Sequence, residues 1–133
     1  MVEMPSAARA PAVGTAFVEV HVTAPDAPTA TRLAHLLVEE RLAACVQVVP
    51  AVTSVYRWEG AVETTEEHLL LVKTTAATFE AIRDRVRSEH PYDTPEVLAV
   101  PVVAIDARYA TWADASIDPR RDAETPSSTE DHL

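Results

Sequence analysis

The most restrictive feature of the sequence is a pair of long extended runs, residues 44–58 and 61–75, separated only by Glu59 and Gly60. Both runs are rich in β-branched and apolar residues, and a two-residue break that contains glycine is typical of a β-hairpin. At about 3.3 Å per residue each arm reaches roughly 45–50 Å, whereas a domain of about 100 residues is only about 33 Å across. The hairpin is therefore predicted to extend beyond its own domain. Pro50 predicts a bulge or bend within it, because proline lacks the N–H that the strand ladder needs.

An overhanging two-stranded ribbon leaves its edges unpaired, so we expect other copies of the chain to cover it. The sequence pattern predicts, in order, a half-buried strand (16–23), a helix (26–41), the hairpin (44–75), a second helix (76–89), a nearly continuous apolar strand (96–105) and a short C-terminal helix (107–117). Asp26 is predicted to cap the first helix, and Thr74 or Thr75 the second. This order predicts a ferredoxin-like β-α-β-β-α-β fold of the α+β class. Its two helices cover one sheet face, and the other face requires oligomerisation.

Composition limits the domain organisation and the classes of partner. The 133-residue chain has a net charge of −10, which argues against nucleic acid and anionic membranes because both repel an acidic protein. We expect one domain over 16–117, a disordered N-terminal arm over 1–15 and a disordered acidic tail over 118–133. Cys45 is the only cysteine, and no signal-peptide pattern is recognised. These two features predict a cytoplasmic protein.

No pattern in the sequence supports catalysis. It contains only two glycines, so a glycine-rich phosphate loop is absent, and neither a nucleophile–base pair nor a dinucleotide fingerprint is present. The five histidines are scattered, without the spacing of an intrachain metal site. The chain is therefore predicted not to be an enzyme and to need no obligatory cofactor.

Five segments match a known family in their order along the chain. They are 23–26 (Thr-Ala-Pro-Asp), 41–46 (Arg-Leu-Ala-Ala-Cys-Val), 54–60 (Ser-Val-Tyr-Arg-Trp-Glu-Gly), 67–74 with its Lys-Thr end, and 90–96 (His-Pro-Tyr-Asp-Thr-Pro-Glu). On these segments the chain resembles the CutA family of divalent-cation tolerance proteins over residues 17–117. The resemblance implies a ferredoxin-like protomer in a compact homotrimer. It also implies an association with copper and other divalent cations through a tolerance phenotype rather than a defined reaction.

Two residues are candidate ligands for copper or another divalent cation. The thiolate of Cys45 is a strong ligand for copper or zinc, although a lone buried cysteine also packs as a small apolar residue. His90 is interpreted either as a helix C-terminal residue that favours the negative end of the helix dipole, or as a ligand brought toward Cys45 across a protomer boundary. Val22 and Glu89 stand where some relatives have a cysteine and a histidine, so a metal site carried over from the family has fewer ligands here.

A second set of residues predicts a cleft between subunits. Lys73 ends an apolar strand and is predicted to pair with Glu67 or Glu96. If these side chains meet at a subunit seam, they form a polar pocket for a small anionic metabolite; the other interpretation is that they only hold the trimer together. The predicted cleft has one apolar anchor and four polar walls: Trp58 with Glu67, Lys73, Tyr92 and Glu96.

The leading functional prediction is a homotrimer that binds divalent cations, copper foremost, and provides tolerance to them. The alternative is a trimeric small-metabolite sensor or signalling scaffold that binds its ligand at the subunit clefts. This alternative rests on an analogy of fold and assembly with the nitrogen-regulatory PII proteins. A third reading is a structural trimer that presents a partner-binding surface.

Overall fold

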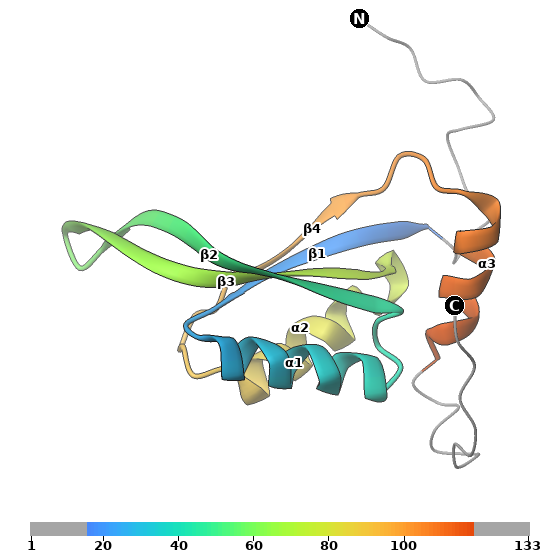
Figure 1. Ribbon diagram of the computed structural model, residues 1–133, viewed down its shortest axis with the longest axis horizontal. Coiled ribbons are helices and arrows are strands. Elements are labelled where there is room, and N and C mark those ends of the chain that lie inside the picture. Colours follow the sequence, from blue (N-terminus) through green and yellow to red (C-terminus); the bar gives the residue numbers. More distant parts are fainter. Residues whose placement is uncertain (1–15, 119–133) are drawn as a thin grey trace, which may run out of the picture.

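A computed structural model describes residues 16–118 of the chain. The elements, in chain order, are β1 (Phe17–Ala24), α1 (Ala27–Glu39), β2 (Cys45–Trp58), β3 (Ala61–Thr75), a 3₁₀ turn (Ala76–Thr78), α2 (Phe79–Glu89), β4 (Val97–Pro101) and α3 (Ala107–Ser116). The four strands form one antiparallel sheet in the order β2-β3-β1-β4. Helices α1 and α2 cover one face of this sheet, and α3 lies at the end away from the hairpin tip (Figure 1). The predicted ferredoxin-like fold, with its long hairpin and short C-terminal helix, is confirmed.

The two predicted tails fall almost wholly outside the described residues. The arm over 1–15 is not described at all, and of the tail over 118–133 only Asp118 is, where its N–H donates to the Arg41 carbonyl at 3.1 Å. Within residues 16–118, none of the helices has the length and apolar character needed to cross a membrane.

Helix α1 begins where the sequence predicted and builds the core on one face of the sheet. The Asp26 carboxylate accepts a hydrogen bond from the Thr29 N–H at 2.9 Å, which satisfies one of the free donors of the first turn. Leu33 and Leu37 then point at the sheet and are fully buried. The strands and α2 supply the other large members of this core: Val20, Val22, Leu70, Val72, Ile82 and Val86.

The β2-β3 hairpin overhangs the domain as predicted. β1 pairs with β3 only as far as Ala24 opposite His68; beyond that point, among the described residues, segments 52–58 and 61–67 pair with each other alone. Figure 1 shows this ribbon reaching well past both helices. The ladder shifts register between Val49 and Val52, where Ala51 has a φ of 59°, so the bulge predicted at Pro50 is confirmed.

The tip of the hairpin is a tight two-residue turn. Glu59 and Gly60 have φ values of 50° and 84°, the pair of positive angles that a type I′ turn requires. Glycine reaches such an angle without the steric cost that a Cβ imposes. The break in the sequence pattern at these two residues therefore marks the turn correctly.

The prediction for the last strand is wrong in two respects. β4 is Val97–Pro101 rather than 96–105, because its neighbour β1 begins at Phe17, whose carbonyl accepts the final hydrogen bond from the Val102 N–H at 3.1 Å. The strand is also not buried, since Leu98 and Val100 are 44% and 37% exposed. The nearly continuous apolar run predicted a well-buried strand, but in the described chain nothing covers one of its faces. Pro101 also predicted a sheet edge or a bulge, and β4 is indeed an edge strand.

The prediction of a threonine cap on α2 is also wrong. Thr74 Oγ1 donates to the Leu42 carbonyl at 2.7 Å, and Thr75 Oγ1 hydrogen-bonds Thr78 Oγ1 at 2.7 Å. Neither hydroxyl reaches a free N–H of the helix, because the 3₁₀ turn Ala76–Thr78 separates them from its first residue.

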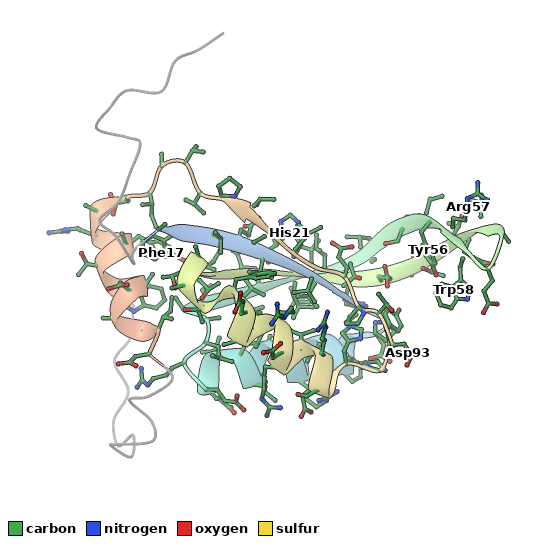
Figure 2. The ribbon with its side chains drawn as sticks, turned by 180° about the vertical axis from the view of Figure 1, so that it is seen from behind. Phe17, His21, Tyr56, Arg57, Trp58 and Asp93 are labelled. Carbon is green, nitrogen blue, oxygen red and sulfur yellow. The ribbon has the colours of Figure 1, made fainter. Side chains whose placement is uncertain are left out.

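The second face of the sheet is not covered by α1 or α2, and α3 lies only at one end of it (Figure 1); we call it the open face. Strand residues that alternate with the core residues point to it. They include Glu19 and His21 of β1, Cys45 of β2, Leu69, Leu71 and Lys73 of β3, and Leu98 and Val100 of β4. Figure 2 shows His21 on the side of the sheet away from α1 and α2.

Candidate functional site

The centre of the open face holds a cluster of three charged or titratable side chains. Lys73 Nζ donates to Glu19 Oε2 at 2.5 Å, and His21 Nε2 lies 2.9 Å from Glu19 Oε1. Their side chains are only 23–27% exposed. Lys73, and then His21, lower the pKa of Glu19 below its ordinary value by hydrogen bonding to its carboxylate. The prediction that Lys73 pairs with Glu67 or Glu96 is therefore wrong within one chain, because Glu19 lies directly opposite Lys73 in the ladder.

Two members of the predicted cleft do meet, at the point where the hairpin leaves the domain. The Tyr92 hydroxyl donates to Glu67 Oε2 at 3.0 Å, and this carboxylate is buried, with 7% exposure. Burial, and then the Glu67 carboxylate, raise the pKa of Tyr92 to about 12. We call this contact the hairpin root, since it ties the loop after α2 to the first overhanging residues of β3.

His90 contacts Thr23 and Tyr92 and so stabilises the hairpin root. Its Nε2–H donates to the Thr23 carbonyl at 2.7 Å, and its Nδ1 accepts the Tyr92 N–H at 3.1 Å. Its ring also packs against that of Tyr92, with centroids 4.7 Å apart. Both ring nitrogens are therefore engaged, and a metal ion could bind His90 only by displacing one of these hydrogen bonds.

The other two members of the predicted cleft lie apart from this contact within one chain. Trp58 is at the hairpin tip and is 56% exposed, and Figure 2 shows it with Tyr56 and Arg57 on the ribbon beyond the domain. From its ladder partner Ala61 to Lys73 is a dozen residues of β3, roughly 40 Å at about 3.3 Å per residue. Glu96 is exposed beside β4. A cleft that joins Trp58 to Lys73 requires a neighbouring subunit and stays a prediction.

Cys45 and His90 are likewise at different ends of the sheet. Cys45 lies opposite Lys73, whereas His90 contacts Thr23, which lies opposite Leu69. Leu69 and Lys73 are four residues apart along β3, which corresponds to roughly 13 Å. Among residues 16–118, no three His, Cys, Asp or Glu side chains are grouped so that they could hold a metal ion. The described part of one chain therefore does not complete a metal site, and a shared site for Cys45 and His90 across a protomer boundary stays a prediction.

A cavity of about 220 Å³ lies between the open face and α3. Glu19 and Lys73 form one side of it, and Tyr109 of α3 and Ile105 form part of the other. Burial, with a smaller contribution from Cys45, raises the pKa of Tyr109 above its ordinary value. The lining is largely apolar, with an ion pair in the wall, so the cavity suits a small molecule that has an apolar body.

The sequence reasoning missed three residues of this region as site members: Glu19, His21 and Tyr109. Glu19 and His21 alternate in the sequence with Val18, Val20 and Val22, so they belong to the polar side of the first strand, but the register that places Lys73 opposite Glu19 is not specified by the sequence pattern. In a ferredoxin-like sheet the first strand pairs with the third, so a lysine on that strand was the available signal. Tyr109 lies on a short helix whose packing the sequence pattern does not specify.

The comparisons with known proteins agree on one family. Residues 18–116 match the family described as CutA1 divalent ion tolerance protein. A "Divalent-cation tolerance protein CutA" of Thermus thermophilus is 47% identical over 93 residues, which cover 70% of this chain and 90% of that protein. The "Protein CutA 1, chloroplastic" of Oryza sativa is 43% identical over 93 residues, which cover 70% of this chain but only 52% of that protein.

Solved structures show the same fold. The divalent cation tolerance protein of Thermus thermophilus superposes with a TM-score of 0.75 at 43% identity, covering 77% of this chain and 99% of that one. The "Periplasmic divalent cation tolerance protein CutA" of Archaeoglobus fulgidus gives 0.75 at 34% identity, covering 77% and 99%. These descriptions name ion tolerance and no catalysed reaction, in agreement with the prediction that the chain is not an enzyme.

Proposed function

Because the chain belongs to the CutA1 divalent ion tolerance family, we propose that it provides tolerance to divalent cations by binding them as a homotrimer, with copper foremost. The match of the family over 18–116, which is almost the whole described chain, is the observation that carries this proposal. The structure of one protomer adds two supporting arguments, one for the assembly and one for the place of the cation.

The assembly is supported by apolar surface that one chain leaves uncovered. On the overhanging ribbon Val55 and Val62 are each 64% exposed and Trp58 is 56% exposed. A two-stranded ribbon of this kind is marginally stable in water when it stands alone. The open face adds Leu98 and Val100 of the edge strand β4. Large apolar side chains left exposed on the ribbon and on the edge strand favour a protein interface there, and copies of the same chain are the occupant that we propose.

The cation is proposed to bind where protomers meet. One chain groups fewer than three metal-ligating side chains anywhere in residues 16–118, so a second protomer must complete the site. Cys45 is the soft ligand that the open face offers, because it alternates along β2 with Val46, which packs into the core. Thiolate sulfur favours Cu(I) over harder cations, which supports copper as the foremost cation.

Calorimetry on the full chain tests this proposal. Cu(I), Cu(II) and Zn(II) are titrated into the wild type, Cys45→Ser and Cys45→Ala, and the stability of each variant is measured in parallel. We expect both variants to bind Cu(I) more weakly, and the wild-type affinity to rise with pH because thiolate ligation releases a proton. Equal Cu(I) affinity in the wild type and both variants would assign Cys45 to packing alone, and absence of binding to all three cations would refute the proposal.

The cavity beside α3 favours a second candidate function, the binding of a small metabolite. Lys73 is one of its lining residues and is the cation that the sequence assigned to an anionic ligand. Its ion pair with Glu19 leaves little net charge to attract an anion, so we place this function second. A panel of nucleotides and small carboxylates, titrated into the wild type and Lys73→Ala, separates the two. Only the metabolite function predicts binding that Lys73→Ala weakens while the trimer persists.

The cytoplasm remains our proposal for the location of this chain, on the basis of its single cysteine. The names of the relatives place one in a chloroplast and one in a periplasm. Fractionation of cells that express the full chain tests the proposal directly.

A further inference from the structure

Glu67, at the hairpin root, is the one acidic side chain in residues 16–118 that is buried, with 7% exposure. Its Oε2 accepts the Tyr92 hydroxyl at 3.0 Å. Its Oε1 accepts no hydrogen bond from the described residues and still reaches solvent. No lysine, arginine or histidine of residues 16–118 forms an ion pair with this carboxylate. Glutamate is rarely buried unless a cation accompanies it, so the hairpin root presents an oriented carboxylate that lacks its cation.

Arg57, near the tip of the overhanging ribbon, is the complementary group. It is exposed, and no carboxylate of residues 16–118 forms an ion pair with it. It lies opposite Val62 in the ladder and shares its face of the ribbon with Val55. Both valines are 64% exposed and belong to the apolar surface that the proposed trimer buries. A guanidinium carried into an interface with them requires a carboxylate on the other side.

These two groups do not meet within one chain. Glu67 lies opposite Val52 in the ladder, so every second residue of β2 from Val52 onward shares its face of the ribbon, and Arg57 is on the other face. Val62 and Glu67 are also five residues apart along β3, which corresponds to roughly 16 Å. A contact between them therefore joins the tip of one protomer to the root of another. Such a head-to-tail contact between two different surfaces closes into a ring, in agreement with the proposed trimer.

We infer that Arg57 of one protomer binds Glu67 of the next at each seam of the trimer. The inference rests on the proposed trimer and names the charged contact that orients its subunits. The guanidinium donates to the open Oε1 and to the remaining lone pair of Oε2, and the partly exposed ring of Tyr92 offers it a surface for stacking. Two other arginines also lack an ion pair in residues 16–118, Arg87 and Arg108. They lie on α2 and α3, so Arg57 is the one that the ribbon carries to a neighbour.

Sedimentation velocity over a dilution series of the full chain at pH 7.5 tests the inference with Arg57→Ala, Glu67→Gln and the double variant. Arg57→Ala leaves the Glu67 carboxylate covered without a cation, and we expect it to weaken each seam by about tenfold. With three seams, the association constant of the trimer falls by about a thousandfold. Glu67→Gln keeps an oxygen for the Tyr92 hydroxyl, and the Arg57 variant leaves the hairpin root intact if the glutamine variant does not fold. Arg87→Ala is the matched control, since Arg87 is equally exposed but lies on α2.

We expect Arg87→Ala to associate as the wild type does. The double variant should associate no more weakly than Arg57→Ala alone, because the pair is already broken in the single variant. An Arg57→Ala trimer as tight as the wild type, whether or not Glu67→Gln is weakened, or losses that simply add in the double variant, overturns the inference and leaves the proposed trimer intact. A wild-type chain that is monomeric at every concentration overturns the proposed trimer and the inference with it.

Discussion

Replacing Tyr92 with phenylalanine removes a single hydroxyl from the hairpin root. That hydroxyl donates to Glu67 Oε2 at 3.0 Å, and Glu67 is only 7% exposed. A hydrogen bond to a charged group contributes about 1.5–3 kcal/mol to stability. Because Tyr92 is itself 38% exposed, water replaces part of the lost donor. We therefore expect Tyr92→Phe to lower the free energy of unfolding by about 1.5 kcal/mol, the lower end of that range.

Urea unfolding measures this change, at one fixed protein concentration because the stability of an associating chain depends on concentration. Tyr109→Phe is the matched control. It also removes a hydroxyl from a partly buried ring, which packs against Trp112 at 5.5 Å, but no hydrogen bond of that hydroxyl is found among residues 16–118. We expect the control to change stability by less than about 0.5 kcal/mol. An equally small change in Tyr92→Phe would refute the role of the Glu67 bond.

The same contact predicts a pH dependence on the alkaline side. Burial and the Glu67 carboxylate raise the pKa of Tyr92 to about 12, from an ordinary value of 10.0. A group whose pKa is raised in the folded state stabilises the fold fully below its unfolded pKa, and this stabilisation is lost as the pH rises through about 12. Absorbance of the phenolate should show a step near pH 12 that Tyr92→Phe lacks and Tyr109→Phe keeps. A step that persists in Tyr92→Phe would contradict the assignment.

Three further predictions concern the core, the hairpin tip and the open face. Leu33→Ala removes a fully buried side chain and should lower the free energy of unfolding by about 3 kcal/mol in urea; a loss below about 1 kcal/mol would mean that the core collapses around the gap. Gly60→Ala should cost about 1 kcal/mol, measured by thermal unfolding, because the φ of 84° strains any Cβ although no atom lies within 4 Å of it. Glu19→Gln should reduce the loss of stability that the wild type shows as the pH falls below about 4.5, since Lys73 lowers the pKa of Glu19 and a carboxylate with a lowered pKa stabilises the fold only while ionised. Identical acid profiles for the variant and the wild type would contradict this.

The elements of the fold could be predicted because each depends on local chemistry. The two positive φ values at Glu59 and Gly60, the bulge at Pro50 and the cap at Asp26 all follow from what single residues can do with their own backbone. The length of the hairpin arms then predicted that the hairpin extends beyond its own domain. Strand order came from the sequence of elements, since β-α-β-β-α-β has few ways to form one sheet.

The burial of the last strand and the partners of the site residues depend instead on distant parts of the molecule. The apolar run over 96–105 predicted a well-buried strand, but pattern alone does not say whether a face is covered by the same chain or by another. Lys73 was assigned to the wrong carboxylate because its partner was fixed by the register of β3 against β1, which places Glu19 opposite it. His90 was weighed as a ligand, whereas its hydrogen bonds to Thr23 and Tyr92 arise only when the loop after α2 folds back over the end of β1.

The mass of the folded particle tests the proposed trimer most directly, since copies of the chain must cover the open face and the overhanging ribbon. Light scattering on the full chain at micromolar concentration and pH 7.5 measures it without a label or a ligand. We expect three times the chain mass of 14.4 kDa. A well-folded particle of a single chain mass would contradict it.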